Sequence, residues 1–197
     1  MSREVGMTYS TFLFAVLALL LAPGPTNTLI GLAGAQRGLR SLWRLLPAEL
    51  IGYLTTILPA AWYGAMMIER WPMAAIVLKL VAAVWVMYLA IRLWVPRSDA
   101  VGSDEVTAKC VYITTTLNPK ALIVALVLLP TPTDEQFQLK LALFCASAAG
   151  VALVWAVFGT MTRSKVDGEN RRTAVRRVAS VWLAIVSGSL LIAAFSV

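Results

Sequence analysis

The chain has 197 residues, of which 59% are hydrophobic and 14% are charged, whereas ordinary soluble domains have roughly 45 to 50% and about 25%. Because the apolar excess runs along the whole chain, we expect an all-α integral membrane protein that forms one membrane domain over residues 1–197. The formal charge of +7 would favour a nucleic-acid partner in a soluble protein, but here the basic residues gather in alternate loops, as in membrane proteins, and no nucleic-acid partner is expected.

Six segments are long and apolar enough to cross a membrane, since a transmembrane helix needs roughly 20 residues. They cover approximately residues 9–36, 48–68, 73–95, 110–129, 139–161 and 178–197. The first segment is longer than one span requires, and we expect two half-helices there, 9–22 and 26–36. Small residues at every fourth position predict close helix contacts in the last two spans; they are Ala142, Ala146, Gly150, Ser180, Ala184 and Gly188.

Two short breaks interrupt the first and fourth spans, Pro23-Gly24-Pro25-Thr26-Asn27 and Asn118-Pro119-Lys120. They lie about 95 residues apart, at matching points of two halves that cover about 8–95 and 106–197. Paired Gly/Pro interruptions of this kind are the best sequence indication of a transporter binding site made of broken helices. We therefore predict that helices 1 and 4 are broken. The predicted substrate site consists of Pro23, Gly24, Pro25, Thr26, Asn27, Asn118, Pro119 and Lys120.

The loop charges predict the orientation. Most of the 17 Lys and Arg residues fall in the loops between spans 1 and 2, 3 and 4, and 5 and 6, which are therefore expected on the cytoplasmic side of the inner membrane. Both termini are then outside. With three spans in each half, the second half enters from the opposite side, so any structural repeat is an inverted 3+3 repeat.

Few residues have the chemistry of an active site. The chain has no histidine, and catalytic sets, metal-ligand clusters and cofactor motifs are not found, so we expect no enzyme and no cofactor. Lys120 lies about ten residues, or about 15 Å, from either end of span 4. A lysine at this depth is a candidate for function, and capping of carbonyls freed near Pro119 is the alternative.

Two further ionisable residues are candidates for ion coupling. Lys79 lies near the outer end of span 3, where its side chain can also reach the headgroups by snorkelling. Glu49 is the only acid inside the predicted spans. Its position near the start of span 2 also suits the positive end of a helix.

The two breaks suit a ligand with both a carboxylate and an amine. Thr26 and Asn27 open the second half of span 1, where free N–H groups favour an anionic group. The helix end and Lys120 would bind the carboxylate, while amide oxygens and released carbonyls would bind the amine. The expected partners are a small zwitterionic solute and membrane lipid, and assembly into a homo-oligomer stays open.

At these residues the chain resembles the LysE/RhtB family of small amino acid exporters, the LysE-type translocators. The resemblance rests on the following segments, which cover nearly the whole chain in order: Ala22 to Asn27, Arg37-Gly38, Lys79, Tyr88-Leu89, Thr116-Leu117-Asn118-Pro119-Lys120-Ala121 and Leu129-Pro130. It implies ion-coupled, secondary export of amino acids or related metabolites, with the two halves rocking around a midplane site. The chain departs from the family in reading Gly52-Tyr53 where many members have an acid, and Glu49 stands one turn earlier.

Three other interpretations remain open. A cation or metal exporter of the same superfamily would need clustered acids or thiols within the membrane. A membrane redox carrier would need the fold to bring Cys110 and Cys145 together. A structural or lipid-organising membrane protein would need the breaks only for stability.

Overall fold

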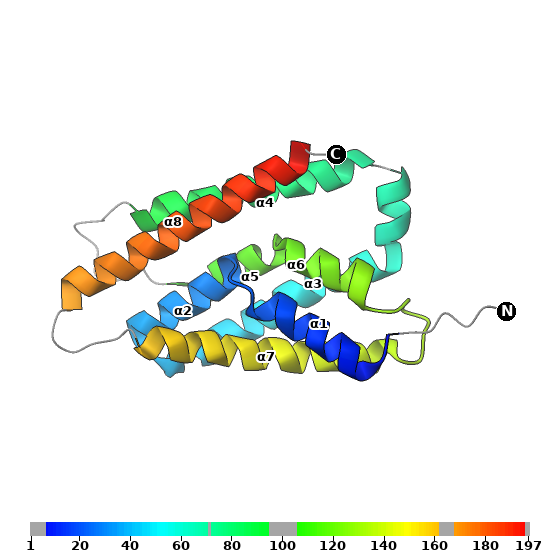
Figure 1. The fold of residues 1–197 in the computed structure, drawn as a ribbon, viewed down its shortest axis with the longest axis horizontal. Helices are drawn as coiled ribbons and strands as arrows, with labels where there is room; N and C mark the ends of the chain where they lie inside the picture. Colours follow the sequence, from blue (N-terminus) through cyan, green and yellow to red (C-terminus); the bar gives the residue numbers. More distant parts are fainter. Residues whose placement is uncertain (1–6, 71, 95–105, 162–167, 196–197) are drawn as a thin grey trace.

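The computed structural model describes residues 7–70, 72–94, 106–161 and 168–195 (Figure 1). Within these ranges the chain is helical with no strand, which confirms the all-α prediction there. The helices are α1 (Tyr9–Leu21), α2 (Pro25–Arg37), α3 (Leu42–Arg70), α4 (Pro72–Trp94), α5 (Ala108–Thr116), α6 (Pro119–Ile123), α7 (Phe137–Met161) and α8 (Gly168–Phe195). A 3-10 turn, η1 (Leu39–Ser41), precedes α3, and a π-helical turn, η2 (Val124–Leu128), continues α6.

Several of these helices are long and apolar enough to cross a membrane. Leu39–Gly64 and Phe137–Met161 qualify individually. Two bent pairs qualify when each pair is taken as one span: α1 with α2, bent by 64°, and α5 with Pro119–Leu128, bent by 47°. The described chain thus has the helices of a membrane protein, and both helix breaks occur where the sequence predicted them.

Local sequence explains where these helices begin and end. Pro25, Pro72 and Pro119 are the first residues of α2, α4 and α6, a position where the missing N–H of proline costs little. At its other end, α2 stops at Gly38, whose φ of 73° lies in the left-handed region that glycine adopts readily. Pro47 stands just before the predicted span 48–68 but lies inside α3, so this helix begins earlier than its apolar segment.

The last helix begins earlier than the apolar pattern predicted. α8 starts at Gly168, about ten residues before the expected start at 178. Hydropathy marks only the apolar part of a helix, whereas Arg and Glu are themselves good helix formers. The basic stretch from Arg171 to Arg177 is therefore part of a helix and not of a loop.

The helices form three packed groups (Figure 1). The pair α1 and α2 packs on α7, α5 and α6 with η2 pack on α3, and α4 packs along α8. Figure 1 shows the C-terminal ends of α2, α4 and α7 at the same end of the molecule as the first turns of α3 and α8. The loops predicted to be cytoplasmic therefore start or end at one end of the molecule.

Glycine allows the closest helix contact. A Cβ added to Gly34 would clash with the backbone of Ala156, and one added to Gly159 would clash with the carbonyl of Gly31. Thus α2 and α7 cross with their backbones in contact. By contrast, a Cβ at Gly150 or at Gly188 would meet nothing within 4 Å, so the prediction that these two glycines make close helix contacts is wrong.

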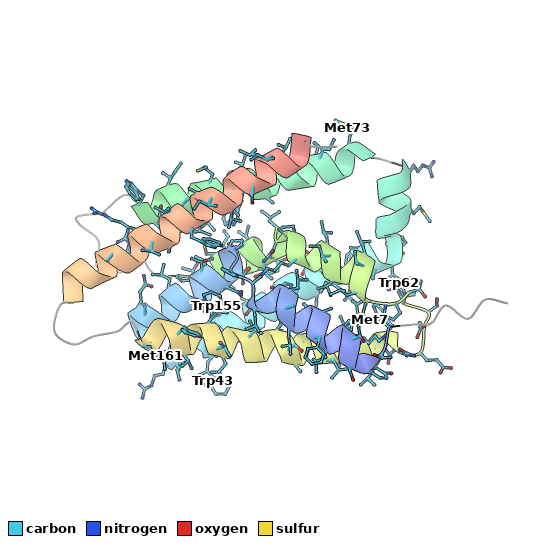
Figure 2. The ribbon with its side chains drawn as sticks, in the orientation of Figure 1. Met7, Trp43, Trp62, Met73, Trp155 and Met161 are labelled. Atoms are coloured by element: carbon cyan, nitrogen blue, oxygen red, sulfur yellow. The ribbon has the colours of Figure 1, made fainter. Side chains whose placement is uncertain are left out.

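Many side chains outside the core are apolar, which fits a membrane protein. Large apolar side chains are exposed along α4 and α8 as well as α1 and α7. Trp43 and Trp62 are both exposed (Figure 2). Tryptophan is enriched at membrane–water interfaces, and exposed tryptophan fits a protein that lies in a membrane.

Candidate functional site

The first helix break leaves backbone carbonyl groups that a side chain then satisfies. Proline has no N–H, so Pro23 cannot continue the hydrogen bonding of α1. Nδ2 of Asn27 donates to the carbonyl oxygens of Leu20 at 2.7 Å and Ala22 at 3.0 Å. Asn27 is buried, and its amide therefore closes the end of α1 from the first turn of α2.

The second helix break closes mainly through its own residues. Oδ1 of Asn118 accepts a hydrogen bond from the backbone N–H of Lys120 at 3.1 Å and so caps α6. The backbone N–H of Asn118 donates to the carbonyl of Thr115 at 3.0 Å. From α3, Oγ1 of Thr56 donates to the carbonyl of Thr116 at 2.8 Å.

The two breaks meet in the interior. Nδ2 of Asn118 donates to Oγ1 of Thr26 at 3.2 Å. The hydroxyl groups of Thr26 and Thr115 also lie 3.2 Å apart. All three side chains are buried, and they join residues that are about 90 positions apart in the sequence.

Lys120 reaches from the second break to the first. Its Nζ donates to the carbonyl oxygens of Leu20, at 3.4 Å, and of Ala22. A Cβ added to Gly24 would lie 3.3 Å from Cε and Nζ of this lysine, so the glycine provides room for the side chain. The lysine thus caps carbonyl groups, as the alternative interpretation suggested, but they belong to α1 and not to the helix around Pro119.

Glu49 is buried next to this site on α3. Only 2% of its surface is exposed, and its Oε2 has no hydrogen-bond partner within the described part of the chain. Its charge interacts with that of Lys120. One turn later, Tyr53 packs edge-on against Phe144 of α7, with ring centroids 5.2 Å apart. The carboxylate of Glu49 is therefore close enough to Lys120 to interact with it electrostatically, and its Oε2 makes no hydrogen bond in the described part of the chain.

The other residues that the sequence predicted for the site differ in how deeply they are buried. Gly24 and Pro25 are buried at the first break, whereas Pro23 is exposed beside it. Pro119 is half-buried as the first residue of α6. Lys79 belongs to α4, and its side chain lies outside the described residues.

Sequence reasoning missed two polar residues. Thr115 contacts the first break, and only the polar run just before Asn118 pointed to it. Lys140 falls at the start of the predicted span 139–161 but was not singled out; it lies in the first turn of α7, is 2% exposed and donates to the carbonyl of Met7 at 2.7 Å. Its Nζ also lies 5.6 and 5.8 Å from the ring centroids of Tyr9 and Phe12.

The site has no features of a metal or thiol centre. Among the residues that the structure describes, no group of three or more Cys, Asp or Glu side chains is placed to hold a metal ion. Cys110 and Cys145 are not bonded to each other. They pack against different hydrophobic clusters, so the fold does not bring the two thiols together.

The geometry defines a class of site: two broken helices whose breaks share buried hydrogen bonds inside an all-α protein with membrane-length apolar helices. Comparisons of the chain with family models, with curated proteins and with solved structures find no match.

Proposed function

We propose that the protein is a secondary transporter that exports small amino acids or amino acid derivatives across the cytoplasmic membrane. The observation that carries this proposal is the contact between the two breaks, in which Asn118 and Thr115 meet Thr26 while Lys120 reaches the end of α1. Broken helices that meet in this way supply backbone groups for a polar ligand inside a membrane.

The architecture supports an inverted repeat of three spans. In such a repeat, spans 1, 2 and 3 correspond to spans 4, 5 and 6. The packing of α1 and α2 on α7 then corresponds to the packing of α5 and α6 on α3, and α4 pairs with its own counterpart, α8. This matched packing favours six spans with oppositely oriented halves, and the loop charges favour both termini outside.

Lys120 suggests how a zwitterion binds. The carbonyl groups of Leu20 and Ala22 accept hydrogen bonds from its ammonium, and the amine of an amino acid has the same chemistry. A bound ligand amine would take over these carbonyl groups and release the lysine. The released ammonium would then bind the ligand carboxylate, so one exchange of partners satisfies both charged groups of the ligand.

Glu49 is the proposed site of proton coupling. A buried carboxylate is costly in its charged form unless it is paired or hydrogen-bonded, and Oε2 of Glu49 has no hydrogen-bond partner in the described structure. Movement of Lys120 towards Glu49 lowers the free energy of the charged carboxylate, and movement away raises it. Ligand binding and proton binding are thereby linked.

Export from proteoliposomes tests the proposal. The purified protein is reconstituted, the vesicles are loaded with single amino acids from a panel, and release is measured with and without a pH gradient. We expect at least one amino acid or derivative to leave faster from vesicles with protein, and faster again with the gradient. If no member of the panel moves, the proposed function fails; parallel vesicles loaded with divalent cations test the alternative superfamily activity.

A further inference from the structure

The end of α1 presents backbone carbonyl groups that the helix itself leaves free for other donors. The helix ends just before Pro23, and the chain bends by 64° before α2, near the middle of the molecule (Figure 1). The last carbonyl groups of a helix point along its axis and form the negative end of its dipole. Those of Leu20 and Ala22 therefore favour a positive charge beside them.

Each of these two carbonyl groups accepts two hydrogen bonds. Nδ2 of Asn27 donates to both oxygens, at 2.7 and 3.0 Å, and Nζ of Lys120 donates to the same two oxygens. A carbonyl oxygen has two lone pairs, so the neutral amide uses one on each oxygen and the ammonium uses the other. The ammonium thus lies where a free cation would bind to these oxygens.

A buried carboxylate balances the charge of the ammonium. Glu49 of α3 is 2% exposed, and its charge interacts with that of Lys120. Two carbonyl oxygens, the negative end of a helix and one carboxylate together match a single positive charge. In transporters with broken helices, unwound carbonyl groups and the C-terminal ends of half-helices coordinate Na⁺. Here a lysine supplies the positive charge at the same kind of helix end.

The space around the ammonium depends on a glycine. A Cβ added to Gly24 would lie 3.3 Å from Cε and from Nζ of Lys120, so a side chain at this position would crowd the ammonium. Ala22 and Pro23 are exposed. An ion that replaced the ammonium could therefore reach the carbonyl oxygens from outside.

We propose that the end of α1 is a binding site for a monovalent cation, and that the ammonium of Lys120 is its tethered occupant. Because this occupant is part of the chain, the parent protein needs no free cation at the first break. A small alkylammonium or alkali ion binds there once the ammonium is removed. The inference stands on the contacts of the first break and does not depend on the proposed export.

Rescue of a lysine variant by added cations tests this proposal. Lys120→Ala removes the ammonium and leaves space for methylammonium. The midpoint of thermal unfolding of the purified full chain in neutral detergent is measured in methylammonium, sodium or tetramethylammonium chloride at equal concentrations. We expect methylammonium to raise the midpoint saturably by a few degrees, because an ion that binds only the folded state stabilises it. Tetramethylammonium has no N–H donor and should not do so.

Lys120→Met is a second test, which does not require the alanine variant to fold. The methionine side chain ends where Cε of the lysine lies, so the position of Nζ is left open for an ion as small as Na⁺. Sodium should therefore raise the unfolding midpoint of this variant more than tetramethylammonium does. The parent protein should unfold at the same temperature in all three salts, because its own ammonium fills the site.

Thr55→Ala controls for general effects of the salts. Thr55 is exposed on α3 and donates only to the carbonyl of Ile51 in its own helix, so this variant should respond alike to the three salts. Stabilisation of either lysine variant by methylammonium or sodium, with none in Thr55→Ala, supports the site. Lack of stabilisation in both lysine variants, or equal stabilisation of the parent or of Thr55→Ala, would overturn the proposal.

Discussion

The two helix breaks occupy matching places in the sequence, but their backbone groups are satisfied differently. At the second break, Asn118 caps its own helix, and the surrounding backbone hydrogen bonds are local. At the first break, the carbonyl groups of Leu20 and Ala22 accept from Asn27 and from Lys120, which comes from the other half of the chain. The first break takes a donor from the second, whereas the carbonyl groups of the second are satisfied by its own residues and by Thr56 of α3.

This difference indicates that the two breaks have different roles. A break closed by local hydrogen bonds can keep its shape while other parts move. A break closed by a distant lysine can open as soon as another cation takes the place of that lysine. We therefore expect changes at Lys120 to affect function, whereas changes at Asn118 should mainly affect stability.

The largest expected effect follows from replacing Lys120 by methionine. Lys120→Met keeps much of the side-chain volume but removes the ammonium that links the breaks. We expect export to fall to the level of vesicles without protein, because the ligand carboxylate then lacks its cation. The measurement is amino acid release from proteoliposomes.

Lys140→Met is the matched control for that experiment. Lys140 is also a lysine that donates to a backbone carbonyl, that of Met7, but it lies on α7 away from the breaks. This variant should unfold at a lower temperature while it keeps export. Normal export by Lys120→Met, or equal loss in both variants, would contradict a specific role for Lys120.

Glu49→Gln should have the next largest effect. Glutamine has nearly the same shape as glutamate but cannot exchange a proton. We expect the variant to bind its substrate, measured by equilibrium binding, but to lose the acceleration of export by a pH gradient. Driven export at the parent rate would rule out the proposed proton role of Glu49.

A double-mutant cycle in unfolding free energy sharpens the comparison of the breaks. Asn27 and Lys120 donate to the same two carbonyl groups, so Asn27→Ala and Lys120→Met should be non-additive by about 0.5 to 3 kcal/mol. The Asn118 side chain contacts the backbone N–H of Lys120 and not its ammonium, so Asn118→Ala and Lys120→Met should be nearly additive. Coupling of equal size in the two cycles would mean that the breaks are alike.

The smallest predicted effect concerns the contact between the breaks. Thr26→Val removes the oxygen that accepts from Asn118 and leaves a buried amide donor unsatisfied, at a cost of about 1 kcal/mol or more. Thr55→Val is the control, because Thr55 is exposed and donates only within its own helix, to the carbonyl of Ile51. Unfolding midpoints that are equally lowered in both variants would argue against a tight contact at Thr26.

The helix breaks were predictable from sequence because proline acts locally. Pro25 and Pro119 lack an N–H wherever they stand, and each follows a turn-forming or capping residue, Gly24 or Asn118, so each favours a helix start. Pro47 shows that a proline alone does not decide this, because it lies inside α3. Buried membrane helices also have an apolar composition that is independent of their partners. The all-α class and the starts of α2, α4 and α6 follow from such local properties.

The remaining features depend on contacts between distant residues. Whether Lys120 binds a ligand or a carbonyl group depends on where the end of α1 lies, and nothing in the sequence around Lys120 determines this. Lys140 was missed because hydropathy does not indicate that a lysine is buried against Met7 and two aromatic rings. The early start of α8 was missed for a related reason, since its first turns are helical but not apolar.

The contact at Gly34 and Gly159 has a consequence for how such a molecule can move. Helices whose backbones touch cannot slide past one another without overlap of atoms, so α2 and α7 form one mechanical unit although they come from opposite halves of the chain. With α1 they make one body, and α3, α5 and α6 make another. If the protein works by alternating access, each moving part combines helices from both halves of the sequence. The chain then passes from one moving part to the other between α2 and α3 and again between α6 and α7, and the two parts are not its first and second halves.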